Sequence, residues 1–170
     1  DPHYLHGTGT HVAVTDASGR ATAKIRSGTA GISTITARVD GLLGSQRVEF
    51  VSTTPAKLAL QSSPANVGVN LTATSTNSSQ LIAVVRDAND NPVKGQTVSF
   101  SAVLDPSNGR IEPAVATTDS SGVATVAFFP GANSTGNNQI VIQASIPGAT
   151  TVVPAQTRLT ASKQELFVRV

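Results

Sequence analysis

The sequence contains no cysteine, which excludes a disulfide-linked core of the antibody type and any metal site built on thiolates. It has no tryptophan and a single tyrosine, Tyr4, so it lacks the aromatic platform on which sugars stack. Charged residues make up only 13% of the chain, the net charge is +2, and the basic residues are scattered. We therefore expect no phosphate-binding surface and no nucleic-acid partner.

Long apolar runs are also missing. No run approaches the roughly 20 residues that a membrane-spanning helix needs, and nothing resembles a signal peptide. We expect no membrane insertion by these residues, and we expect any targeting or anchoring segment to lie outside them.

The residues that are present favour strands. Valine and threonine are abundant, and β-branched side chains suit a pleated, half-buried surface better than a helix. Glycine, proline, asparagine and aspartate recur at short intervals, and no stretch shows the apolar spacing of three and four that a helix requires. The composition predicts an all-β protein.

One segment occurs twice. Residues 15–22 read TDASGRAT and residues 118–125 read TDSSGVAT, with six of eight positions identical and an offset of 103 residues. The similarity continues from residues 35–39 to residues 142–146, where a longer loop raises the offset to 107. A repeat of about 100 residues has the size of an immunoglobulin-like sandwich and is too long for a solenoid repeat. The sequence predicts tandem copies of one domain.

The duplication also predicts which face of each strand is buried. In residues 20–26 the charged positions alternate with apolar ones and must face water, so the apolar positions face the core. Phe129, like Val123 and Ala127, then faces outward and needs a cover from a loop or a neighbouring domain. The positions predicted to face inward on the matched strands are Ala21, Ala23, Ile25, Ser33, Ile35, Ala37, Val39, Val48, Phe50, Ala124, Val126, Phe128, Ile140, Ile142, Ala144, Ile146, Thr157 and Leu159.

The second copy has a front half that the first copy lacks. Strands are predicted around Leu58 and Leu60, over residues 80–87, and over residues 98–104, where apolar residues alternate up to Leu104. The first copy offers only a strand near residues 11–14 and those on residues 21–25, 35–39 and 48–50. The predicted core of the second copy consists of Val98, Phe100, Leu104, Ala124, Val126, Phe128, Ile142 and Ala144, with Ala102 also facing inward.

Four motifs of the second copy carry a family resemblance. They are VRDANDNPV at residues 85–93, VSF at 98–100, GRI at 109–111 and TDSSGVA at 118–124. In this order and spacing they resemble the bacterial Ig-like domain of intimin and invasin adhesins. The resemblance implies an immunoglobulin-like β-sandwich in tandem domains. It divides the chain into a rear half-domain at residues 1–53, a complete domain at residues 54–162, and the first strand of a following domain at residues 163–170.

The same resemblance implies a function. Domains of this type form rods or spacers of surface adhesins, anchored to the outer membrane by other regions and presenting a tip that binds a host-cell receptor. The expected partners are neighbouring Ig-like domains of the same protein, with any receptor bound by other domains. The alternative is an accessory Ig-like module of a secreted carbohydrate-active enzyme or a phage structural protein. The shortage of aromatic residues disfavours sugar binding by stacking.

Two clusters have the residue types of a metal site. His3, His6 and His11 lie within nine residues, but glycines separate them at a chain terminus, where ligands are poorly fixed. Asp87, Asn89, Asp90 and Asn91 have the oxygen density of a calcium loop but lack the glycine and distant glutamate of an EF-hand. We interpret this second cluster as a turn whose side chains bind local backbone amides. We expect no metal site and no cofactor.

Asp16 and Asp119 recur at equivalent positions, each followed three residues later by glycine. This spacing is typical of a tight hairpin, in which glycine supplies a positive φ. No nucleophile, base and orienting group can be assembled, so we expect no catalytic residues and no enzyme activity. The N-x-S/T acceptors at Asn70, Asn77 and Asn133 are close to chance in a chain this rich in asparagine, serine and threonine.

The half-domain should expose an apolar face and unpaired strand edges. We expect it to be completed either by self-association with a second copy of the chain, which could accept the strand at residues 166–170, or by front strands outside these residues.

Overall fold

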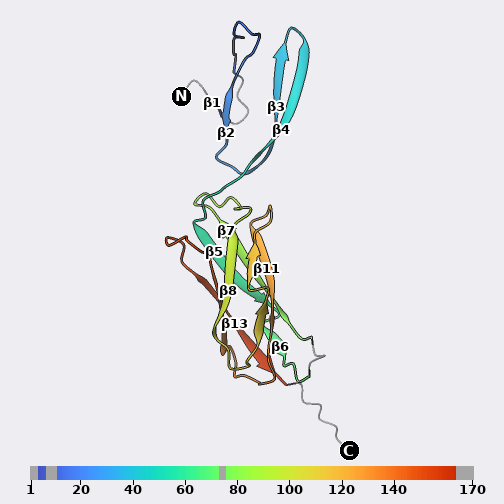
Figure 1. Cartoon of the computed structure of the whole chain (residues 1–170), viewed down its shortest axis with the longest axis vertical. Helices are drawn as coiled ribbons and strands as arrows, with labels where there is room; N and C mark the ends of the chain where they lie inside the picture. The colour runs from blue at the N-terminus through green and yellow to red at the C-terminus, as the bar shows by residue number, and fades with distance from the viewer. Residues whose placement is uncertain (1–3, 7–10, 73–75, 164–170) are drawn as a thin grey trace, which may run out of the picture. The chain divides into compact units, whose positions relative to one another are not determined.

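The computed structural model describes residues 4–6, 11–72 and 76–163 of the chain, shown in Figure 1. Its elements are all β-strands, which confirms the predicted all-β class. The described residues form no helix that is long and apolar enough to cross a membrane. The chain divides into two compact units, Asp1–Val51 (unit 1) and Ser52–Val170 (unit 2). The predicted strand at residues 166–170 and His3 lie outside the described residues.

Unit 2 is an immunoglobulin-like β-sandwich of two sheets. One sheet has the order β10-β8-β12-β13-β6, and the other has the order β5-β7-β11-β9. All pairings are antiparallel except that of β6 with β13. The strands of unit 2 are β5 (Lys57–Ser63), β6 (Asn66–Gly68), β7 (Ser79–Arg86), β8 (Thr97–Leu104), β9 (Arg110–Glu112), β10 (Val115–Thr117), β11 (Val123–Phe129), β12 (Ile140–Ser145) and β13 (Ala155–Ser162).

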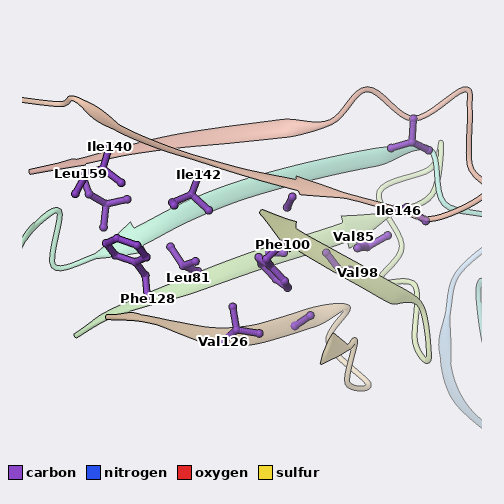
Figure 2. Packing of buried hydrophobic residues seen from close by; sticks show 14 of the residues in the cluster. Leu81, Val85, Val98, Phe100, Val126, Phe128, Ile140, Ile142, Ile146 and Leu159 are labelled. Atoms are coloured by element: carbon purple, nitrogen blue, oxygen red, sulfur yellow. The ribbon is translucent and has the colours of Figure 1, made fainter. Parts of the chain in front are cut away.

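The core lies between these two sheets, where the alternating apolar side chains gather as Figure 2 shows. Phe128 is fully buried, as is Leu81 from the neighbouring strand β7. Seven of the eight predicted core residues are buried, which confirms the inward faces predicted from the alternation of residues 98–100 and from the duplication. The confirmed core residues are Val98, Phe100, Ala124, Val126, Phe128, Ile142 and Ala144.

Leu104 is the exception, because 51% of its surface is exposed, and Ala102 is exposed as well. The register of β8 against β12 explains the error. Ile142 pairs with Ala102, but the adjacent Val141 pairs with Leu104, so β8 carries one extra residue at this point. A β-bulge of this kind interrupts the alternation of inward and outward side chains. The prediction carried a strict period of two through the bulge at Val103 and was therefore wrong at Leu104. Ala102 lies before the bulge, in register with Ile142, so the bulge does not account for its exposure.

Phe129 faces outward and is half-buried, as its position predicts. A cover for its ring comes from its own sheet. Arg110 of β9 pairs with Phe129 across the same sheet, and the central carbon of its guanidinium lies 4.6 Å from the centre of the ring. A cation over an aromatic face is electrostatically favourable at this distance.

The described residues of unit 1 form four strands in two separate pairs. β1 (Tyr4–His6) pairs in parallel with β2 (Lys24–Arg26), and β3 (Gly31–Val39) forms an antiparallel hairpin with β4 (Leu42–Phe50). The hairpin turns at Asp40 and Gly41, whose φ values of 45° and 86° suit a two-residue connection of type I′.

The hairpin of unit 1 has one apolar and one polar face. The register places on one face Ile35, Val39, Leu42, Val48 and Phe50. None of the described residues of unit 1 is buried, and the best covered on this face are only half-buried. Val39 is 63% exposed and Leu42 is 75% exposed. The prediction assigned the apolar face correctly, but this unit does not bury it.

Two predicted strands of unit 1 are wrong in whole or in part. Residues 11–14 form no strand, and residues 21–25 are extended only from Lys24 onward, with Ala21 and Ala23 exposed. The physical reason lies in the pairing. In unit 2 the equivalent segments are held by β8 and β7, and a strand is stable only beside a partner.

Candidate functional site

The turn at Asp87 is built around one carboxylate. Its Oδ1 accepts hydrogen bonds from the backbone amides of Asn89 and Asn91, at 2.9 and 2.8 Å, and its Oδ2 accepts one from Asn91 Nδ2 at 3.0 Å. The Asn91 side chain is the main reason that the pKa of Asp87 lies below its ordinary value. The two backbone amides and the Ser52 side chain act in the same direction, against the opposing effect of desolvation. The predicted turn is therefore present.

The same geometry occurs at three further aspartates. Asp16 and Asp119 each use Oδ1 to accept from the amides two and four residues ahead, at 2.8–3.0 Å. Asp105 does so with its two oxygens, reaching the amides of Ser107 at 3.0 Å and Gly109 at 2.6 Å. In each turn the third residue after the aspartate has a positive φ; these residues are Gly19 at 77°, Asp90 at 65°, Asn108 at 58° and Gly122 at 75°.

These hydrogen bonds leave little carboxylate for a metal ion at the Asp87 turn. The second carboxylate of the cluster, that of Asp90, lies 2.7 Å from Lys57 Nζ, and the Asp90 carbonyl accepts from Arg86 at 2.7 Å. No group of three His, Cys, Asp or Glu side chains that could hold a metal occurs among the described residues. Folding without a metal stays a prediction.

The histidine cluster is only partly described. His3 lies outside the described residues, and His6 ends strand β1. His11 is exposed and shares a shallow hollow with Thr22, Ala23 and Lys24. A lysine ammonium beside an imidazole repels a metal cation, so this hollow does not favour a metal site.

The Asp119 turn connects two strands of the sandwich. Thr118 Oγ1 donates to the carbonyl of Val93 at 2.6 Å and accepts from the amide of Gln96 at 2.8 Å. The amide of Val85 donates to the carbonyl of Gly122 at 2.8 Å. The repeated motif thus joins the end of β7 and the start of β8 to β11, which is a structural role.

Two of the three N-x-S/T asparagines are part of the fold. Asn70 Nδ2 donates to the carbonyl oxygens of Pro130 and Asn77, at 2.8 and 3.0 Å, and Asn77 Nδ2 donates to that of Val69 at 3.0 Å. A glycan on Asn70 would replace one of the two hydrogens that this nitrogen donates, so at least one of its two bonds would be lost. Asn133 is exposed and makes only a long contact of 3.4 Å to Pro106.

Sequence reasoning missed the Asp105 turn, which directly follows the strand predicted to end at Leu104. A signal was available, because Asp16, Asp105 and Asp119 are each followed by serine two residues later. The Ser18 and Ser107 hydroxyls donate to their aspartates at 2.6 Å. The cation over Phe129 could not have been found, since it depends on the pairing of β9 with β11.

The comparisons with known proteins concern the fold. No protein-family model matches the sequence, and no curated protein matches it. The adhesin InvE of Yersinia pseudotuberculosis is similar at 25% identity and a TM-score of 0.45, over 62% of this chain and 26% of that chain. The D0-D1 domain of intimin is similar at 19% identity and a TM-score of 0.45, over 88% of this chain and 76% of that chain.

A third similar structure is a glycosyl hydrolase family 2 member from Bacteroides cellulosilyticus. It is 17% identical with a TM-score of 0.49, over 84% of this chain and 18% of that chain. An adhesin and an intimin domain are therefore among the structures that this chain is similar to, and the chain spans about a quarter of the InvE structure.

Proposed function

We propose that the chain is a structural segment of tandem Ig-like repeats in a bacterial cell-surface adhesin of the intimin and invasin type, and that it is not an enzyme. The observation that carries the proposal is the duplicated turn. Asp16 in unit 1 and Asp119 in unit 2 make the same two amide hydrogen bonds from equivalent positions. Turns of this geometry also occur at Asp87 and Asp105, so the support for tandem copies comes from the segments around Asp16 and Asp119, which are identical at six of eight positions about 100 residues apart.

The division into repeats belongs to the same proposal. Residues 1–53 are the rear half of one repeat, residues 54–162 are a complete repeat, and residues 163–170 begin the next. The acidic residues support a structural role, because all four aspartates described above hold turns and Asp90 pairs with lysine. The four motifs quoted from unit 2 support the adhesin type.

As a spacer, the segment extends the reach of a binding domain located elsewhere in the adhesin. Strands of seven or eight residues rise about 3.3 Å per residue, so each module adds about 25 Å of length. Its direct partners are the neighbouring Ig-like domains, its location is the outer surface of the bacterium, and receptor contact belongs to other domains.

A domain replacement in the parent protein tests this function. Residues 54–162 are exchanged for an unrelated β-sandwich of similar length, and adhesion of the bacterium to host cells is measured beside a deletion of the same residues. We expect the replacement to restore the adhesion that the deletion weakens. If the replacement leaves adhesion as weak as the deletion does, the segment itself binds and the spacer function is wrong.

A further inference from the structure

Among the described residues of unit 1, two segments do not form the strand pairs that their counterparts form in unit 2. At the offset of 103 residues, Val12 is equivalent to Val115, which pairs with Ser99 of β8. Residues 11–14 form no strand in unit 1, and Val12 and Val14 are 86% and 90% exposed. This segment is therefore extended in unit 2 by contact with a β8 strand that unit 1 does not contain.

The second segment is residues 20–26, which are equivalent to β11 and of which residues 20–23 belong to no strand. In unit 2, β11 pairs with β7 along almost its whole length, from Val123 opposite Val84 to Phe128 opposite Ser79. In unit 1 only Lys24–Arg26 is a strand, and it pairs with β1 instead. Ala21 and Ala23, whose counterparts in unit 2 are buried, are exposed.

The apolar face of the β3–β4 hairpin is the third feature that is uncovered. Ile35 and Phe50 match Ile142 and Leu159, which are fully buried in unit 2. There the cover comes from apolar residues of the opposite sheet, among them Leu81 of β7, and Phe100 of β8 extends the same inner face beside β12. In unit 2, β8 also pairs along one edge of β12. The strand of unit 1 that corresponds to β12 is β3.

A fourth observation identifies the connection between the missing strands. Thr118 fixes the segment that runs from β7 to β8, through its bonds to Val93 and Gln96. Its counterpart Thr15 is exposed on the same aspartate turn in unit 1. A threonine in this position is suited to hold a β7-to-β8 connection in unit 1 as well.

We infer that unit 1 is an acceptor for one occupant, a strand–turn–strand polypeptide with the pattern of residues 79–104 from a further copy of this repeat. Its first strand adds beside residues 20–26, its second strand adds between residues 11–14 and the edge of β3, and its connection binds Thr15. The apolar residues of the first strand cover the β3–β4 hairpin, as Leu81 and Val85 do in unit 2, and those of the second strand extend its apolar face, as Phe100 does. This inference rests on the repeat organisation proposed above.

A chain extended at its front tests the inference. A second copy of residues 54–103 is joined directly ahead of residue 1, which reproduces the repeat offset of 103. Amide hydrogen exchange is followed by mass spectrometry for residues 11–14, 20–26 and 31–50. We expect exchange in these segments to slow by at least about tenfold relative to the unextended chain, since paired core strands open less often than exposed ones. The amides of β11 and β12 in unit 2, which the added copy does not contain, give the internal control for folding.

A matched control carries aspartate at the added positions equivalent to Val98 and Phe100, and this variant should give no protection of unit 1. Protection of unit 1 in neither chain overturns the inference. It is also overturned if the unextended chain protects these segments as a dimer, detected by sedimentation, because the occupant is then a second copy of the whole chain. These results are independent of adhesion, so the inference and the spacer function fail separately.

Discussion

The carbonyl oxygen of Gly122 accepts a hydrogen bond from the amide of Val85 at 2.8 Å, and a Cβ atom added to Gly122 would lie 2.5 Å from the carbonyl oxygen of Val85. The duplicated turn therefore packs directly on strand β7, without room for a side chain. Glycine is therefore required at position 122 for two reasons: a side chain does not fit, and the φ of 75° is one that other residues rarely adopt.

Gly122→Ala should consequently destabilise unit 2 by about 2–4 kcal/mol, because the substitution adds a backbone clash to the cost of a positive φ. Gly95→Ala is a matched control in the same unit, since Gly95 has a φ of 74° and nothing within 4 Å of its added Cβ. It should cost about 1 kcal/mol. Urea unfolding of the two variants measures the difference, and equal losses would contradict the close packing of the turn on β7.

The two adjacent phenylalanines of β11 should differ in their contribution to stability. Phe128→Ala removes a fully buried ring and should cost about 3–5 kcal/mol, a large share of the stability of such a domain. Phe129→Ala removes a half-buried ring and its contact with Arg110, and should cost about 1–2 kcal/mol. Denaturant unfolding of both variants gives the comparison. A loss at Phe128 below about 1 kcal/mol would show that the inward face is assigned wrongly.

Features of this fold that depend on the local sequence were predicted correctly, and features that depend on how strands pair were not. Strict alternation and the duplication placed Phe100 and Phe128 in the core, because a strand's two faces follow directly from its period. Leu104 was placed wrongly because the bulge beside it depends on how β8 pairs with β12. The missing strand at residues 11–14 was likewise mispredicted, since an extended segment needs a neighbour that the local sequence does not reveal.

The turns were more predictable than the strands. Asp87 and Asp119 satisfy backbone amides within four residues, so their geometry is encoded locally. The cover of Phe129 is the opposite case, because Arg110 reaches the ring only through the pairing of two strands.

Acid should destabilise unit 2 through the Asp87 turn. The pKa of Asp87 is lowered in the folded state, chiefly by the Asn91 side chain, so the unfolded state binds more protons as the pH falls. The stabilisation is complete above the ordinary aspartate pKa of about 3.9 and is lost as the pH falls through the lower folded value. Thermal melts from pH 6 to pH 2 should show this loss, and Asn91→Ala should move it to higher pH. An unchanged profile in that variant would contradict the role of Asn91.

Calcium should leave the stability of unit 2 unchanged. The Asp87 carboxylate already accepts three hydrogen bonds within its turn, and that of Asp90 pairs with Lys57. Thermal melts with a chelator and with millimolar calcium should therefore give the same midpoint. A midpoint that rises with calcium would overturn the interpretation of residues 87–91 as a turn, since a ligand that binds only the folded state stabilises it.

The central claim is that the chain holds one complete repeat and one that lacks its front strands. Amide hydrogen exchange of the unmodified chain at neutral pH tests it most directly. We expect slow exchange in β7, β11 and β12 of unit 2, and exchange close to that of an unfolded chain at residues 11–14 and 20–23 of unit 1. Equally slow exchange in both units, from a chain that sedimentation shows to be a monomer, would contradict the claim.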